Sequence, residues 1–290
     1  MSVPQPISEL SDSDIDTDHS DKAMGKAMKA VAWSGETGKS CVPTMRGPTK
    51  LATKNGGCAK TIDVLEVFSG SGNLSHAIRK QHLTTEEVDL EQCSTHDMSS
   101  KDFVMSLKQK AVSQKVQYCH LAPPCNTYSQ ARYPRVRTIE YPEGIPELTK
   151  KDKPVIKLAN CITNNTMWFA NELIKEKKYV SIENPKTSLL WRTKVFKALR
   201  KRHKLIEVVY DNCKYGCSYR KRTSIWSNAP FLAVLARKCA CKAKGKAHTI
   251  LSGWRPKNRS AVMQPTRGTA AYPLPLCSKW AASVSSAVKA

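Results

Sequence analysis

The chain has 290 residues, of which 40% are hydrophobic, and this is enough to bury one main core with tails or a small subdomain. No apolar stretch of about 18 or more residues occurs, and the first residues lead into a run of serine and aspartate. We therefore expect neither a secreted nor a membrane-spanning protein. The eleven cysteines are scattered and odd in number, which favours free thiols, a nucleophile or metal ligands in a reducing compartment.

The net charge of +23 is unevenly distributed along the chain. Residues 1–22 hold six acids and one base, so this stretch carries −5 and the remainder carries +28. Because each phosphate that a lysine or arginine neutralises releases condensed counterions, such an excess favours a nucleic acid as the partner. A basic surface kept for solubility is the alternative, and charge alone does not separate DNA from RNA.

The N-terminal part differs in composition from the rest. Residues 1–58 are rich in Ser, Asp, Lys, Gly and Pro, which predicts a disordered tail, acidic and then basic. From residue 61 onward, short apolar strands alternate with helical segments; the strands are expected over 62–68, up to 88–89, and over 116–121 and 179–182, and the helices over 74–81 and 157–178. This alternation predicts a parallel α/β sheet, in which ligands bind beyond the carboxyl ends of the strands.

A glycine turn follows the first strand. Gly70 and Gly72 would let the backbone approach a ligand, and the next helix offers free N–H groups, although Ser75 replaces the third glycine of a dinucleotide fingerprint. Asp89 follows the next strand, where a carboxylate would bind ribose hydroxyls; Glu86, Glu87 and Glu91 are its neighbours. Asp97 could bind an adenine amino group. The expected cofactor-binding residues are Phe68, Ser69, Gly70, Gly72, Asn73, Asp89, Asp97 and Pro123.

The segment from His120 to Ser129 contains a cysteine after two prolines, Pro123 and Pro124. A thiol fixed in this way at the end of a buried strand is exposed and held in place, which favours a nucleophile over a structural role for Cys125. The thiolate is the reactive form, so a nearby cation such as Arg132, Arg135 or Arg137 could lower its pKa.

Glu183, Asn184 and Pro185 close another predicted strand. A pyrimidine ring resists attack at C6 unless a group protonates or hydrogen-bonds N3. A carboxyl beside the thiol performs that task, especially if a closed pocket raises its pKa. Cys125 and Glu183 are therefore expected at the ends of neighbouring strands, with complementary roles.

These motifs together resemble the DNA (cytosine-5) methyltransferase family. The turn from Phe68 to Gly72 is similar to the family's first motif, Pro124-Cys125 with Ser129 to its nucleophile segment, and Glu183-Asn184 to its acidic motif. The segment 183–191 resembles a divergent branch of viral or mobile-element type. The resemblance runs from about residue 61 to about residue 285, with the tail outside it.

The resemblance implies a Rossmann-like, S-adenosylmethionine-dependent methyltransferase sheet with a small C-terminal recognition or zinc-like insert. Cys125 would attack C6 of a cytosine flipped out of duplex DNA, Glu183 would bind its N3 and amino edge beside Asn184, and C5 would take the methyl group. It also implies a catalytic core over 59–228, an insert over 229–265 and a return segment over 266–290. If the protein is eukaryotic, a DNA substrate implies that it is located in the nucleus; otherwise it is expected inside the cell.

The chain departs from the family in its later basic motif. The family pattern is Gln-x-Arg-x-Arg, whereas this chain has Tyr219 in place of Gln, followed by Arg220, Lys221 and Arg222. A role in bracing the pocket or binding phosphate is carried over to Arg220 and Arg222, with a solvated charge run as the alternative. The C-terminal segment from Tyr272 to Cys277, followed by Trp280, resembles the part that closes the cofactor site, or equally a terminal core helix.

The predicted insert is short, so we expect low sequence specificity. Within it, Cys239, Cys241 and His248, with Cys213 or Cys217 upstream, could bind one structural Zn²⁺, although Cys-x-Cys is shorter than the usual spacing. Two other functions stay open. The same chemistry acts on cytosine in RNA, and the imperfect basic motif would also suit a nucleic-acid-binding module that has lost catalysis.

Overall fold

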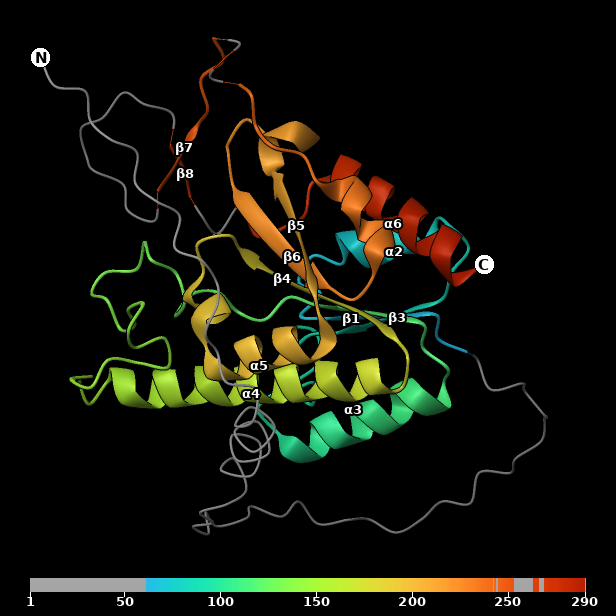
Figure 1. The fold of residues 1–290 in the computed structure, drawn as a ribbon, viewed down its shortest axis with the longest axis horizontal. Coiled ribbons are helices and arrows are strands. Elements are labelled where there is room, and N and C mark those ends of the chain that lie inside the picture. The colour runs from blue at the N-terminus through green and yellow to red at the C-terminus, as the bar shows by residue number, and fades with distance from the viewer. Residues whose placement is uncertain (1–60, 242, 244, 253–262, 266–268, 290) are drawn as a thin grey trace, which may run out of the picture. The chain divides into compact units, whose positions relative to one another are not determined.

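The computed structural model describes residues 61–241, 243, 245–252, 263–265 and 269–289 (Figure 1). The predicted tail over 1–58 and residues 253–262 of the predicted insert lie outside the described residues. Within the described part of the chain, no helix is both long enough and apolar enough to cross a lipid bilayer.

The central element is a six-stranded sheet with the strand order β2-β1-β3-β4-β6-β5. Its strands are β1 (Val64–Val67), β2 (Thr85–Val88), β3 (Tyr118–Leu121), β4 (Tyr179–Pro185), β5 (Ile206–Asp211) and β6 (Arg222–Ser227). The first four strands are parallel, as the alternation of strands and helices predicts. This confirms the Rossmann-like α/β fold class.

The prediction of a wholly parallel sheet is wrong for one strand. Strand β6 runs antiparallel to both β4 and β5, between which it lies. A parallel pair needs a long crossover, usually through an α-helix, whereas only the short 3₁₀ helix η2 (Asn212–Tyr215) and a few further residues connect β5 to β6. The chain therefore reverses direction at this edge of the sheet.

Helices cover both faces of the sheet (Figure 1). On one face α3 (Lys101–Ser113), α4 (Asp152–Lys175) and α5 (Lys194–His203) pack on a core that includes Leu65 and Val67. On the other face α2 (Asn73–Arg79), η3 (Pro230–Leu235) and α6 (Leu274–Val288) pack on a core that includes Val64. Successive residues of a buried strand point to opposite faces, so β1 contributes to both cores.

Three shorter elements complete the described chain. The 3₁₀ helix η1 (Leu189–Arg192) follows β4, and β7 (Ile250–Ser252) pairs in parallel with β8 (Met263–Pro265) in a separate two-stranded sheet.

Helix α6 is part of the second core, in which Trp280 is completely buried. The C-terminal segment is therefore an integral part of this core.

The register of the parallel strands fixes where the loops meet. Val67 in β1 pairs with Val88 in β2 and with Leu121 in β3, and Leu121 pairs with Ile182 in β4. The residues that follow these positions therefore lie along one edge of the sheet. This edge receives the glycine turn, Asp89, the diproline segment and Glu183.

Candidate active site

The glycine turn has a backbone that favours glycine at two positions. Gly70 has a φ of +52° and Gly72 a φ of +64°, and Phe68 before them also has a positive φ, of 62°. The Gly70 amide donates a hydrogen bond of 2.8 Å to Oδ2 of Asp89. Asp89 thus lies against the turn, at the end of the neighbouring strand.

The acidic neighbours of Asp89 have other partners. Glu86 forms an ion pair with Lys110 at 2.6 Å, and Glu87 forms one with Arg79 at 2.7 Å. Asp89 itself accepts from the amides of Gly70 and Glu91, and the Glu87 carboxylate lies against Gly72, so both acids border the turn. Asp97 accepts hydrogen bonds from the amide and the hydroxyl of Ser99, and so holds the turn just before α3.

Sequence reasoning did not single out Gln92, which also contacts the turn. Its Nε2 donates to Oγ of Ser69 at 3.1 Å. At the other end of the turn, Nδ2 of Asn73 donates to the Tyr272 carbonyl at 2.9 Å. The glycine turn is therefore joined to the C-terminal segment just before α6.

The diproline segment is fastened directly to the end of β4. Nδ2 of Asn184 donates a 2.8 Å hydrogen bond to the Pro123 carbonyl, and the Asn184 side chain is buried. This contact brings the loop that carries Cys125 beside the strand end that carries Glu183. Asn184 therefore positions the two groups.

The Cys125 side chain is half-buried, and so is less exposed than the sequence predicts. Burial raises its pKa, the Lys221 ammonium lowers it, and the Glu183 carboxylate raises it. Two of the three arginines expected to act on the thiol have other partners: Arg137 stacks on the Tyr128 ring at 3.8 Å, and Arg132 pairs with Asp152 at 3.1 Å. The cation whose charge lowers the pKa of Cys125 is Lys221.

The Glu183 carboxyl is buried, and one of its two oxygens has no hydrogen-bond partner among the described residues. Its side chain is 8% exposed, and burial raises its pKa against the opposing effects of Lys221 and Tyr272. Oε2 accepts a 3.1 Å hydrogen bond from the Tyr272 hydroxyl. Oε1 is buried and has no hydrogen-bond partner among the described residues. A buried polar atom without a partner is costly, so Oε1 is a natural contact for a ligand.

A chain of buried hydrogen bonds continues from Glu183 through Tyr272 into the core. His120 Nε2 lies 2.9 Å from the Tyr272 hydroxyl, and His120 Nδ1 lies 2.8 Å from Oγ of Ser181. Ser181 Oγ lies 2.6 Å from the Tyr118 hydroxyl, which accepts a 2.8 Å hydrogen bond from the indole N–H of Trp280.

The two ends of this network fix its direction. An indole N–H can only donate, and Oε2 of Glu183 accepts from Tyr272 whether Glu183 is ionised or carries a proton on Oε1. Burial lowers the pKa of His120 to about 3, so the ring is neutral and carries a single N–H. With Tyr272 donating to Glu183, the proton of His120 lies on Nε2, and Nδ1 accepts from Ser181. Every hydroxyl then donates towards Glu183.

The basic motif divides into two parts. Arg220 and Arg222 both form ion pairs with the fully buried carboxylate of Asp211, at 3.0 and 2.9 Å. Lys221, between them, acts electrostatically on both Cys125 and Glu183, and its ammonium donates to the Thr269 carbonyl at 3.2 Å. The charge of Lys221 thus lowers the pKa of both the thiol and the carboxyl, whereas Arg220 and Arg222 are bound to Asp211.

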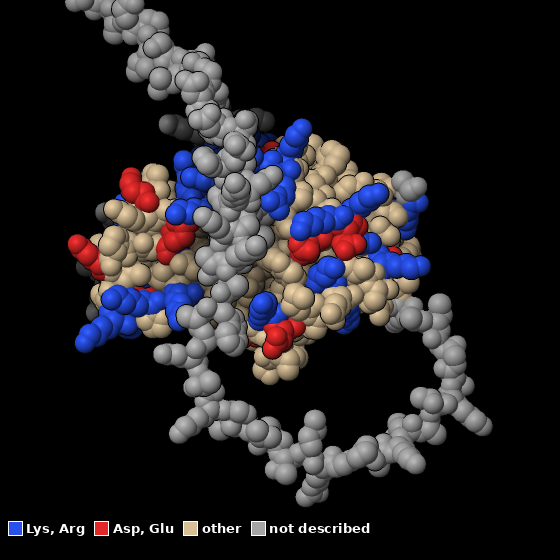
Figure 2. All heavy atoms as spheres, turned by 60° about the horizontal axis from the view of Figure 1, so that its bottom comes forward, with Lys and Arg blue, Asp and Glu red and all other residues tan. Residues whose placement is uncertain are grey.

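Basic side chains are also scattered over the outer surface. The last turn of α5 carries Arg200, Lys201, Arg202 and His203. Figure 2 shows lysine and arginine side chains distributed over one face, with fewer acidic groups between them. Arg200 additionally stacks over the Trp226 ring at 4.5 Å.

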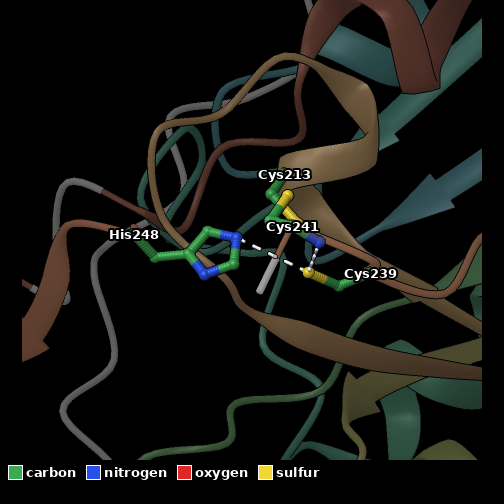
Figure 3. A group of neighbouring side chains, drawn as sticks. All are labelled: Cys213, Cys239, Cys241 and His248. Atoms are coloured by element: carbon green, nitrogen blue, oxygen red, sulfur yellow. Dashed lines mark hydrogen bonds between the residues drawn. The ribbon is translucent and has the colours of Figure 1, made fainter. Parts of the chain in front are cut away.

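A second group of reactive side chains lies beside the β5–β6 connection. The ligand atoms of Cys213, Cys239, Cys241 and His248 all lie within 4.8 Å of one another (Figure 3). We call these four residues the Cys/His cluster. It contains the three residues predicted as ligands, together with Cys213, whereas Cys217 is not part of it.

The fold and these groups define a Rossmann-like protein with a thiol, a carboxyl and a glycine turn at one sheet edge. No family model matches the chain, and no curated protein matches it. Among solved structures it is similar to the S. pombe Dnmt2 methyltransferase, with 13% identity, a TM-score of 0.35, and coverage of 58% of this chain and 49% of that one.

Two further solved structures are similar. One is the Entamoeba histolytica methyltransferase EhMeth, with 14% identity, a TM-score of 0.37, and coverage of 59% of this chain and 54% of that one. The other is a mutant of Spodoptera frugiperda DNMT2, with 14% identity, a TM-score of 0.33, and coverage of 71% and 55%. The chain thus spans about half the length of the proteins it matches.

Proposed function

We propose that this chain transfers a methyl group from S-adenosylmethionine to C5 of cytosine in DNA, through a covalent bond between Cys125 and C6. The observation that carries the proposal is the pairing at the sheet edge: a held thiol lies beside a buried carboxyl whose Oε1 has no partner among the described residues. A flipped pyrimidine needs both groups, one at C6 and one at N3.

The residues of this chain divide the work as follows. Cys125 Sγ, as the thiolate, forms a bond to C6, and the displaced electron pair of the ring is stabilised as Glu183 donates its proton to N3. The ring then has a nucleophilic C5, to which the bound methyl donor supplies an electrophilic methyl group. Loss of the C5 proton to solvent expels the Cys125 thiolate, and N3 returns its proton to Glu183.

The raised pKa of Glu183 suits this role, because the carboxyl must hold a proton until the thiol attacks. The raised pKa of Cys125 opposes attack, since only the thiolate is reactive. The ammonium of Lys221 offsets part of this cost. Lys221 is thus the residue that would favour the thiolate in the pocket.

The glycine turn suits the methyl donor. Gly70 and Gly72 have positive φ values, which glycine adopts without strain, and the bare main chain at Gly70 has no neighbouring atom within 4 Å of where a Cβ would stand. Asp89 lies against this turn and offers carboxylate oxygens to a ribose. In this proposal Gly70, Gly72 and Asp89 hold the adenosine part of the donor.

A nucleic acid is proposed as the substrate because of the charge, and DNA because the motifs resemble those of the DNA (cytosine-5) methyltransferase family. The +23 net charge favours a polyanion, and the basic surface of Figure 2 belongs to the same body as the site. Methyl transfer from tritiated S-adenosylmethionine to cytosine-containing duplex DNA tests the proposal, with tRNA as a second substrate.

We expect label in duplex DNA, loss of labelling in Cys125→Ala, and full labelling in the matched control Cys161→Ala. Label in tRNA alone would replace DNA by RNA as the substrate. Full activity of Cys125→Ala would contradict the covalent mechanism, and binding of DNA without any labelling would indicate a module without catalysis.

A further inference from the structure

We propose that Cys213, Cys239, Cys241 and His248 bind one structural zinc ion, and that this ion joins Cys239, Cys241 and His248 to Cys213 in the β5–β6 connection. This proposal is independent of the proposed function.

The spacing of the four ligand atoms suits a single tetrahedral ion. With Zn–S near 2.3 Å and Zn–N near 2.05 Å, tetrahedral geometry puts two sulfurs about 3.8 Å apart and a sulfur and a nitrogen about 3.6 Å apart. In the structure, Cys239 Sγ and His248 Nε2 are 3.5 Å apart, and all four atoms lie within 4.8 Å of one another (Figure 3).

The chemistry of the donors favours zinc in a structural role. Three thiols and one imidazole make a complete tetrahedral set, which leaves no open position for a reacting water. The amide of Cys241 donates to Cys239 Sγ at 3.3 Å, a contact that would stabilise a metal-bound thiolate. All four ligands are half-buried, so the ion would be sheltered.

The surrounding segment has little else to hold it. None of the described residues between 236 and 250 is buried, so this stretch contributes no side chain to either core. Its backbone is attached at both ends: Arg237 N–H donates to the Val209 carbonyl at 3.2 Å, and Thr249 N–H donates to the Ser218 carbonyl at 3.0 Å. A metal ion would cross-link the part in between, as in other small segments without a core.

The cluster is joined to β5 and to the start of β6 through one buried carboxylate. The Cys239 amide donates to Oδ2 of Asp211 at 2.8 Å, and the same carboxylate pairs with Arg220 and Arg222. A metal ion that holds Cys239 would therefore also stabilise these ion pairs.

The test is the metal content of the full chain, expressed with zinc in the medium and purified without chelator. We expect one zinc per chain, and visible absorption bands of tetrahedral, thiolate-bound cobalt after exchange with Co²⁺. Cys213→Ser and His248→Ala should each lower zinc affinity at least about 100-fold, since even outer-shell partners change metal affinity by about 10- to 100-fold.

Cys161→Ser is the matched control, because this cysteine lies on α4, outside the cluster, and should keep the full zinc content. Removing zinc from the wild-type chain should lower its Tm by at least about 5 °C, since an ion that binds only the folded state stabilises it. This readout does not require the variants to fold.

Several results would overturn the proposal. The site would be excluded if the protein contained no zinc and gave no cobalt spectrum. It would also be excluded if two cysteines of the cluster formed a disulfide, which would lower the mass of the chain by two hydrogens. Zinc bound equally well by Cys213→Ser and the wild type would place the metal elsewhere. Because these measurements need no turnover, they fail or succeed separately from the methyl-transfer assay.

Discussion

The Tyr272 hydroxyl offers a sharp test of how Glu183 is held. Tyr272→Phe removes the donor to Oε2 of Glu183 at 3.1 Å and the acceptor for His120 Nε2 at 2.9 Å, while keeping the ring that packs on His120 and Trp280. Leaving the buried His120 N–H without a partner costs about 1–3 kcal/mol. We expect Tm to fall by several degrees, at about 2–4 °C per kcal/mol for a chain of this size.

The effect on catalysis has a definite sign. The Tyr272 hydrogen bond lowers the pKa of Glu183, so its loss raises that pKa further. Because the protonated carboxyl is the active form, activity declines as pH rises through this pKa, and the decline should move to higher pH in the variant. The less firmly held carboxyl should also lower kcat by about 10- to 100-fold, part of the typical 10²–10⁴-fold contribution of a general acid.

The assay is the pH profile of kcat for methyl transfer, with Tm measured on the same samples. Tyr215→Phe is the matched control, since its buried hydroxyl donates to the Leu235 carbonyl at 2.7 Å, away from Glu183. This control should lose stability but keep its pH profile. An unchanged pH profile and kcat in Tyr272→Phe would refute a role for the network in positioning Glu183.

Three further predictions concern single residues. Lys221→Met should raise the pKa of Cys125 and slow alkylation of this thiol by iodoacetamide at pH 8 several-fold. Lys221→Arg keeps the positive charge and should react at close to the wild-type rate. Equal alkylation rates in the wild type and both variants would exclude Lys221 as the cation that acts on the thiol. Asp89→Ala should weaken binding of S-adenosylmethionine at least about tenfold by calorimetry, while Glu86→Ala leaves it unchanged; the reverse order would reassign the ribose carboxylate. Burial raises the pKa of Glu66 from 4.5 to about 7, so the folded state binds the extra proton and this group makes stability fall as pH rises between those values. Glu66→Gln should therefore gain about 3 kcal/mol relative to wild type between pH 4 and pH 8 in urea unfolding, and an equal difference at both pH values would contradict the buried carboxyl.

The sequence predicts the strand-end residues well because parallel strands place their carboxyl ends at one edge. Ile182 with Glu183 follows from a largely apolar segment that ends in an acid, whereas Asp89 is indicated only by the single apolar residue Val88 before it; the register brings both acids to the edge. The reversal of β6 was not predicted, because strand direction depends on the length of the connection and on the neighbours, and an apolar run shows neither.

Lys221 is not among the predicted site residues, although the spacing of the basic motif indicates this position. With Tyr219 in place of the glutamine of Gln-x-Arg-x-Arg, the first arginine position is Lys221, and Arg220 and Arg222 occupy the intervening positions. The prediction of Arg220 and Arg222 depends on residue type alone. Their buried partner, Asp211, lies on the preceding strand, and sequence spacing gave no reason to connect them.

The hydrogen-bond network behind Glu183 could not be predicted from local pattern. His120 and Tyr272 are 152 residues apart, and Tyr118 and Trp280 are 162 apart. Within a predicted strand, His120 is equally compatible with many packing roles. Only the docking of α6 against α2 brings the C-terminal segment to β3 and gives these polar groups their partners.

The most direct test of the central claim is covalent trapping on duplex DNA that contains 5-fluorocytosine, in the presence of S-adenosylmethionine. Fluorine at C5 cannot leave as a proton does, so a reacting enzyme stays bonded to C6. We predict a complex that survives denaturation and whose modified peptide maps to Cys125, and no complex with Cys125→Ala. A complex mapped to another cysteine, or none with a folded chain that binds both DNA and S-adenosylmethionine, would contradict the assignment of Cys125 as the nucleophile.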